Sequence, residues 1–178
     1  AAATTTGALT GTASVLIGAQ AYLGTGTVVF SDQHDYTGNT IINRSSVLQF
    51  NQGSTATAGP LGFGRTVEVF GTLSANGTTP GTFLANGSTT TNAYTVNTHA
   101  GSVLQLDNSA FTTATMQNRW GDSAALTLNS AVLRVNGPNL TGNLAAVETM
   151  GAITIAGGSQ IDLLRTATNF QVAVTAAS

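Results

Sequence analysis

Residues 102–107 read SVLQLD, and the same pattern recurs as SVLQFN at 46–51 and as AVLRVN at 131–136. Each copy places apolar residues two apart around an outward polar residue and ends on Asn or Asp. Such alternation with a period of two predicts a β-strand that buries one face. GTLSAN at 71–76 and SQIDLL at 159–164 fit the pattern less closely. The chain is therefore expected to repeat one strand.

A second short strand is expected upstream of each copy. These candidates begin at residues 40, 67, 94, 126, 153 and 172, so their starts are 27, 27, 32, 27 and 19 residues apart. A coil of about 27 residues that carries two short strands, stacked at the ~4.8 Å strand spacing, describes a parallel β-helix. The sequence predicts about six rungs and no convincing helix. A third strand at 26–30 and 81–85 would give the coil three faces.

A β-sandwich is the alternative fold, because short polar turns separate many of the strands. The β-helix is favoured, because stacking in parallel register places apolar residues above apolar residues. The expected inward columns of the second strand contain Leu48, Leu73, Leu104, Leu133 and Ile161, and beside them Phe50, Ala75, Leu106, Val135 and Leu163. Those of the first strand contain Thr40, Val67, Tyr94, Leu126, Ile153 and Val172, and Ile42, Val69, Val96, Leu128, Ile155 and Val174. At one corner the expected column is Asn43, Asn97 and Asn129.

The composition excludes several classes of function. Only 7% of the 178 residues are charged, against roughly a quarter in ordinary domains, and there is no lysine or cysteine. With a net charge of −2 and no basic cluster, the chain has no positive surface that would attract nucleic acid or an anionic membrane. No apolar run approaches the ~20 residues of a membrane-spanning helix. We therefore expect no nucleic-acid partner, no membrane insertion of this segment and no cofactor.

A resemblance to a known family is carried by residues 24–50, GTGTVVFSDQHDYTGNTIINRSSVLQF. They resemble the autotransporter-associated beta-strand repeat, whose pattern is G-x-G-x-hydrophobic-x-hydrophobic-S, a short variable turn, Y-T-G-x-T-x-I-N and a final apolar strand. The pattern is met by Gly24, Gly26, Val28, Phe30, Ser31, Tyr36, Thr37, Gly38, Thr40, Ile42, Asn43 and Leu48. Residues 118–135, NRWGDSAALTLNSAVLRV, are similar to a companion motif. The chain departs from the family's usual glycine pair at Ser45-Ser46 and Ser130-Ala131.

The resemblance implies a right-handed parallel β-helix, located on the extracellular side of a bacterial surface. We therefore expect residues 1–178 to form a single segment of a longer repeat array or fibre, acting as a spacer. Neither end has the sequence features of a solenoid cap, so the expected partners are copies of the chain or flanking rungs stacked end to end. The alternative is an adhesin that binds surface glycans through loops 52–66 and 107–121.

The candidates for chemistry are few. Asp32, His34 and Asp35 are weak metal-ligand candidates, and we favour a solvated turn between two strands. His99 has no acidic neighbour in sequence and is expected to be a solvated loop residue. Arg119 and Trp120 are possible ligand contacts, although an aromatic side chain that closes a loop over the side of the helix is the interpretation we favour for Trp120.

An enzyme is the least favoured hypothesis. Parallel β-helices include polysaccharide lyases and glycosidases, and glycosidases need two carboxyl groups ~5–9.5 Å apart. The acidic residues do not stack in such pairs: Glu68 falls in a threonine column, and Glu148 is expected in a loop. One outward column instead places Arg134 beside Asp162, which predicts an ion pair. The sequence thus predicts no catalytic residue.

Overall fold

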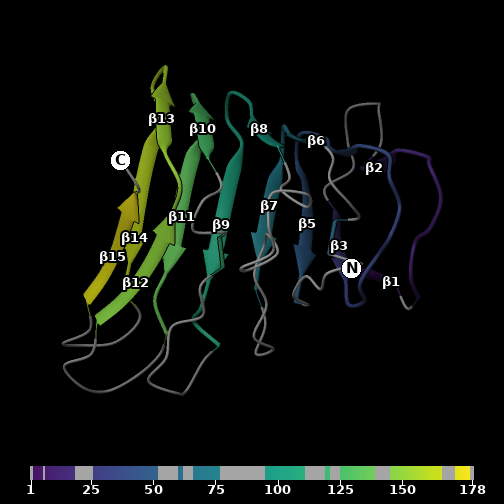
Figure 1. Cartoon of the computed structure of the whole chain (residues 1–178), viewed down its shortest axis with the longest axis horizontal. Coiled ribbons are helices and arrows are strands. Elements are labelled where there is room, and N and C mark those ends of the chain that lie inside the picture. Colours follow the sequence, from purple (N-terminus) through teal and green to yellow (C-terminus); the bar gives the residue numbers. More distant parts are fainter. Residues whose placement is uncertain are drawn as a thin grey trace.

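The protein is a parallel β-helix. The computed structural model describes residues 2–5, 7–18, 26–51, 60–61, 66–76, 95–110, 119–120, 125–138, 145–165 and 171–176. Within these residues there is no helix, and every strand pairing is parallel. A β-sandwich is excluded, because its sheets are antiparallel. Strands β1 and β15 lie at opposite ends of the long axis (Figure 1).

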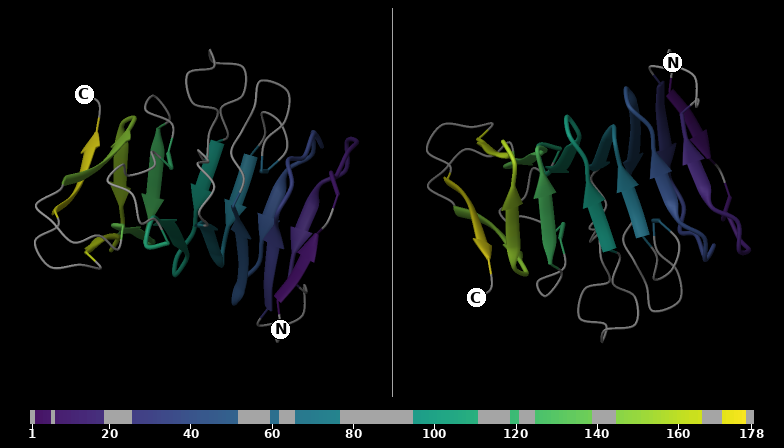
Figure 2. Two further views of the ribbon diagram at one scale, coloured as in Figure 1. Left: turned by 90° about the horizontal axis from the view of Figure 1, so that it is seen from below. Right: turned by 90° about the horizontal axis from the view of Figure 1, so that it is seen from above.

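Two sheets run the length of the stack, and successive rungs lie side by side along it (Figure 2). The seven-stranded sheet consists, in order, of β1 (Ala2–Thr5), β3 (Gly26–Phe30), β5 (Ser46–Phe50), β7 (Thr72–Ala75), β9 (Val103–Asp107), β11 (Val132–Asn136) and β14 (Gln160–Leu164). The six-stranded sheet consists of β2 (Val15–Ile17), β4 (Thr40–Ile42), β6 (Thr66–Val69), β8 (Thr95–Thr98), β10 (Leu126–Asn129) and β13 (Ile153–Ala156). The number of rungs thus differs only slightly from the six expected.

The inward columns predicted for the seven-stranded sheet lie in the core, together with inward residues of the six-stranded sheet such as Ile42, Val69 and Leu128. Leu48 pairs with Leu73, Leu73 with Leu104, and Leu104 with Leu133, in parallel register. All four side chains are fully buried. The neighbouring column from Phe50 to Val135 is confirmed in the same way. Identical apolar positions therefore fill the interior rung after rung.

One register in the six-stranded sheet was predicted wrongly. Val67 pairs with Val96, whereas we expected Tyr94, a residue outside the described part of the chain. The shift of two residues leaves inward positions inward, so alternation alone cannot detect it. It places Thr98 in the core, where its hydroxyl donates to the carbonyl oxygen of Thr127 at 2.9 Å. It also moves Asn97 out of the expected asparagine corner and next to Glu68.

Two further predictions about strands need correction. Residues 171–176 form β15 (Gln171–Ala176), which pairs with β12 (Ala145–Met150) in a separate two-stranded sheet. The expected stacking of Val172 on Ile153 is therefore wrong, and Glu148 lies in a strand rather than a loop. Residues 26–30 do form a strand, but β3 belongs to the seven-stranded sheet and not to a third face. The companion candidate at 81–85 lies outside the described residues.

Tight turns lead from β4, β6, β8, β10 and β13 into the next strand of the seven-stranded sheet. We call the outward side of these turns, formed by residues 43–45, 70–71, 99–101, 129–130 and 156–158, the turn ridge. Ser45 and Ser130 have φ values of 62° and 49°, the left-handed region that Gly101 and Gly157 occupy in the corresponding turns. Serine therefore adopts at two of these turns the left-handed conformation that glycine adopts at two others.

Candidate functional site

A polar cluster on the turn ridge joins two rungs through Glu68 and His99. The register brings Glu68 of β6 beside Asn97 of β8, whose side-chain amide donates to Glu68 Oε1 at 2.8 Å. His99 follows β8, and its Nε2 lies 2.6 Å from Glu68 Oε2. Both the histidine and the carboxylate are partly exposed. His99 is thus not the solvated loop residue expected but part of a cross-rung pair.

The same cluster fixes the ring of Phe70. The Phe70 and His99 rings stack with centroids 3.9 Å apart and planes inclined by 7°. Asn97 holds Glu68, and Glu68 in turn holds His99, so the ring that stacks on Phe70 is fixed by a chain of polar contacts between β6 and the end of β8. This cluster was not predicted, because a register wrong by two residues separates Glu68 from Asn97 and Phe70 from His99. Aligning the aromatic residues Phe70 and His99 in one column would have revealed it.

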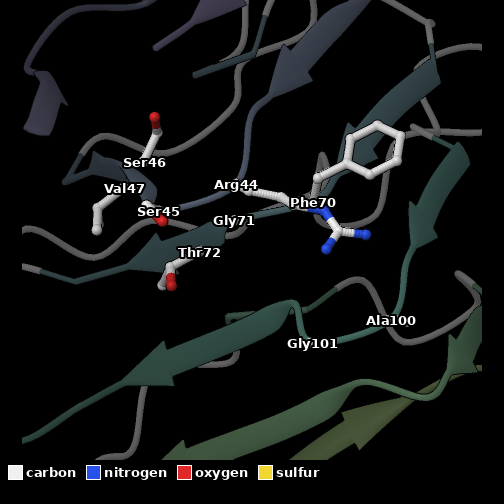
Figure 3. A pocket seen from close by; sticks show the side chains of 9 residues that line it. All are labelled: Arg44, Ser45, Ser46, Val47, Phe70, Gly71, Thr72, Ala100 and Gly101. Atoms are coloured by element: carbon white, nitrogen blue, oxygen red, sulfur yellow. The ribbon is translucent and has the colours of Figure 1, made fainter. Parts of the chain in front are cut away.

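A hollow of about 360 Å³ lies beside Phe70 on the turn ridge and spans three rungs. It is lined by Arg44, Ser45, Ser46, Val47, Phe70, Gly71, Thr72, Ala100 and Gly101. Figure 3 shows the Arg44 side chain extending from its turn toward Phe70. In this view the Ser45 and Thr72 side chains lie on the other side of Gly71. Arg44 is exposed and has no carboxylate partner among the described residues. The hollow combines a cation, hydroxyl groups and an aromatic ring.

The base of this hollow is backbone. A Cβ atom at Gly71 would lie 2.3 Å from the carbonyl oxygens of both Asn43 and Ser46, so no side chain fits there. At Gly101, with φ +81°, nothing lies within 4 Å of the Cβ position. Gly71 therefore packs directly against the neighbouring turn, and open space lies beside Gly101.

The cluster at Asp32, His34 and Asp35 divides between surface and core. Asp32 Oδ2 accepts a hydrogen bond from the Gly7 amide at 2.6 Å, and Asp35 is exposed. His34 is fully buried, and its Nδ1 accepts from the Leu9 amide at 3.1 Å. The interpretation as a solvated turn is therefore wrong for His34. Among the described residues, no group of three or more His, Cys, Asp and Glu residues could hold a metal ion.

His34 is packed as an apolar residue would be. Its ring meets Phe30 edge-on, with centroids 4.5 Å apart, and lies 6.1 Å from that of Tyr36. Burial lowers the pKa of His34, although the charges of Asp32 and Asp35 oppose this. Burial raises the pKa of Tyr36 to about 12, although the hydrogen bond to Thr40 opposes this rise. Both rings are held in their uncharged forms inside the N-terminal rungs.

Arg119 and Trp120 form a buried clamp with Glu148. The Glu148 carboxylate accepts the Arg119 amide at 3.1 Å and the Trp120 amide at 2.5 Å. The Arg119 guanidinium donates to Asn108 Oδ1 and to the Asp107 carbonyl oxygen, each at 3.0 Å. Burial lowers the pKa of Arg119 to about 10, although the carboxylates of Glu148 and Asp107 oppose this. The group remains a cation at neutral pH.

This clamp connects residues 119 and 120 to β12 through Glu148 and to the end of β9 through Asp107 and Asn108. Both side chains are buried, which favours the structural interpretation of Trp120 over ligand contact from the surface. The role of Glu148 was missed because β12 was not predicted. Its sequence, AAVETM, has the acidic residue at an inward position, which obscures the alternation.

The expected ion pair between Arg134 and Asp162 is present. Arg134 lies opposite Asp162 in the register of β11 and β14, and its Nη2 is 3.3 Å from Asp162 Oδ2. Gln160 also donates to the Asp162 carboxylate. A partly exposed pair of this kind contributes about 0.2–1 kcal/mol and favours the observed register.

Comparisons with known proteins return no match: no family model, no curated protein and no solved structure resembles the chain significantly. Among the described residues, no helix has the length and apolar character needed to cross a membrane.

Proposed function

We propose that the chain is a non-enzymatic structural module, a spacer or fibre-forming β-helix of an extracellular bacterial surface protein or filament. One observation carries the proposal: the inward columns become exposed at the C-terminal rung. Leu133 is 0% exposed, whereas Ile161 in the same column is 39% exposed, and Leu163 and Ile155 reach 44% and 56%. These side chains occupy core positions, and among the described residues no strand pairs with β13 or β14 on the outer side.

The edges of the sheets support stacking by a further rung. Strand β14 closes the seven-stranded sheet and β13 the six-stranded sheet, each with a partner on one side only. At the opposite end, β1 and β2 are likewise the last strands of their sheets. A second copy placed head to tail would continue both parallel sheets and cover the exposed apolar column. Such heterologous contacts propagate into filaments.

The described carboxylates support a non-enzymatic role. Except for the exposed Asp35, each has a structural hydrogen-bond or ionic partner: Gly7 for Asp32, His99 for Glu68, Gln105 for Asp107, Trp120 for Glu148 and Arg134 for Asp162. Carboxylates that hold turns and register in this way suit a scaffold. The low charge and the family resemblance of residues 24–50 support an extracellular setting.

Neighbouring leucines on β14 provide a matched test. Leu163 faces inward and is 44% exposed, while Leu164 faces outward and is 46% exposed. We expect the wild-type chain to associate with increasing concentration in sedimentation velocity experiments. Leu163→Asp should abolish association by placing a charge in the stacked core, and Leu164→Asp should leave it unchanged. A chain that is monomeric at every concentration, or two variants that behave alike, would contradict the proposal.

A further inference from the structure

We propose that the hollow on the turn ridge binds a sugar that carries a carboxylate, such as a uronic acid. This goes beyond the structural role, because a spacer needs no ligand site. It also lies away from the exposed rung of β13 and β14, since its residues come from the turns after β4, β6 and β8 and from the first residues of β5 and β7. Binding here and stacking at β14 can therefore be measured separately.

The charge in the hollow selects for an anion. Arg44 is exposed on the turn ridge without a carboxylate partner in the described part of the chain, whereas Arg134 is paired with Asp162. A guanidinium presents several donors in a fixed plane and matches a carboxylate with two parallel hydrogen bonds. A carboxylate ligand would give Arg44 the partner that the described residues do not supply.

The remaining lining residues suit a sugar ring. Phe70 offers an apolar surface that a pyranose ring can pack against, and it is held in place by its stacking on His99. Thr72 contributes a hydroxyl from the outward face of β7, and Ser45 another from the neighbouring turn. An apolar surface with a few placed polar groups is the general composition of small-ligand sites.

The hollow also has room for such a ligand. Its volume of about 360 Å³ falls at the lower end of the ~300–1,000 Å³ typical of ligand pockets. Gly71 and Gly101 place no side chain in the hollow. A Cβ atom at Gly71 would clash with the neighbouring turn, and the φ of +81° at Gly101 disfavours any residue with a side chain. The size favours one or two sugar rings over a longer chain.

The test is isothermal titration calorimetry of the whole chain with glucuronate, with glucose and inorganic phosphate as comparison ligands. We expect saturable binding of glucuronate, with at least about tenfold weaker binding of glucose because the charge-assisted hydrogen bonds are lost. Phosphate should bind more weakly than glucuronate, because it cannot pack against Phe70.

Two variants locate the binding. Arg44→Gln should weaken glucuronate binding at least about tenfold. Arg165→Gln, which changes an exposed arginine outside the hollow, should have no effect. Phe70→Leu should weaken glucuronate more than phosphate, with circular dichroism confirming the fold.

Three results would overturn the inference. They are no heat with glucuronate, equal affinity for glucose and glucuronate, and binding that Arg44→Gln leaves unchanged. Equal affinity for phosphate would overturn the assignment to a sugar. Sedimentation of the Arg44→Gln variant should match wild type, so failure of binding and failure of stacking are distinguishable.

Discussion

The middle rungs and the C-terminal rung have the same sequence pattern but different environments. Leu104 of β9 is fully buried between Leu73 and Leu133, while Ile161 of β14, in the same column, is covered on one side only. Both strands place apolar residues at the inward positions, although β14 also carries the outward Leu164 where β9 has Asp107. In a solenoid, burial is supplied by neighbouring rungs. The pattern of a strand therefore predicts which face turns inward, and its neighbours decide whether that face is buried.

The largest expected effect compares the two positions directly. Leu104→Ala should lower the free energy of unfolding by about 2–5 kcal/mol, because it leaves a cavity in a packed column. Ile161→Ala should cost about 1 kcal/mol, since part of its surface is already in water. Urea unfolding followed by circular dichroism measures both. Equal costs would show that the C-terminal rung is as well packed as the middle.

The clamp at Glu148 tests whether the last rungs are fastened to the middle ones by polar contacts. Glu148→Gln replaces one acceptor oxygen with a donor facing a backbone amide of Arg119 or Trp120, and should cost about 1–3 kcal/mol. The matched change Glu68→Gln removes a partly exposed partner of His99 and should cost less than about 1 kcal/mol. Urea unfolding of both variants is the measurement. A larger loss for Glu68→Gln would contradict the structural role assigned to Glu148.

The turns offer a smaller comparison between serine and glycine. Gly157→Ala should cost about 1–2 kcal/mol, because its φ of +61° disfavours a side chain and the new Cβ would meet the Ser130 hydroxyl. Ser130→Gly relieves the same strain at φ 49° and should stabilise by about 0.5 kcal/mol, since the gain is offset by a more flexible unfolded chain. Thermal melts of the two variants should shift in opposite directions. Shifts of the same sign would show that turn conformation does not limit stability.

The smallest effect concerns pH and the N-terminal rungs. Because burial lowers the pKa of His34 in the folded state, the unfolded chain binds the proton more readily. Stability from this residue is therefore complete above the unfolded pKa of about 6.5 and falls as the pH drops toward the folded pKa, by at most about 1.4 kcal/mol per pH unit. Urea unfolding of wild type and His34→Gln between pH 7.5 and 5 should show the smaller pH dependence in the variant. An identical slope would exclude His34 as its source.

The sequence predicted β5, β7, β9, β11 and β14 of the seven-stranded sheet well because these repeats share both pattern and composition. Leu48, Leu73, Leu104 and Leu133 fall on one another from β5 to β11, and the Asn or Asp that ends each repeat marks the same register. The register of β8 was predicted wrongly because a shift of two residues preserves the alternation. Thr98 also occupies an inward position without being apolar, so it gave no sign of the correct register. That error also hid the pairing of Glu68 with His99, which lie far apart in the chain.

Other features could not be predicted from apolar residues that recur every second position. His34 and Glu148 are inward residues with polar side chains, so sequence reasoning assigned both to loops. Their burial follows from partners in other rungs, the Leu9 amide for His34 and the amides of residues 119 and 120 for Glu148. The hollow beside Arg44 likewise arises from three turns brought together by stacking.

The most direct test of the stacking account is hydrogen–deuterium exchange of the chain at increasing protein concentration. If the C-terminal rung is an interface, amides in 153–156 and 160–164 should exchange more slowly as concentration rises. Those in 103–107 and 132–136, already paired on both sides, should not change. Exchange in 153–164 that is the same at every concentration would contradict the claim that this rung binds another.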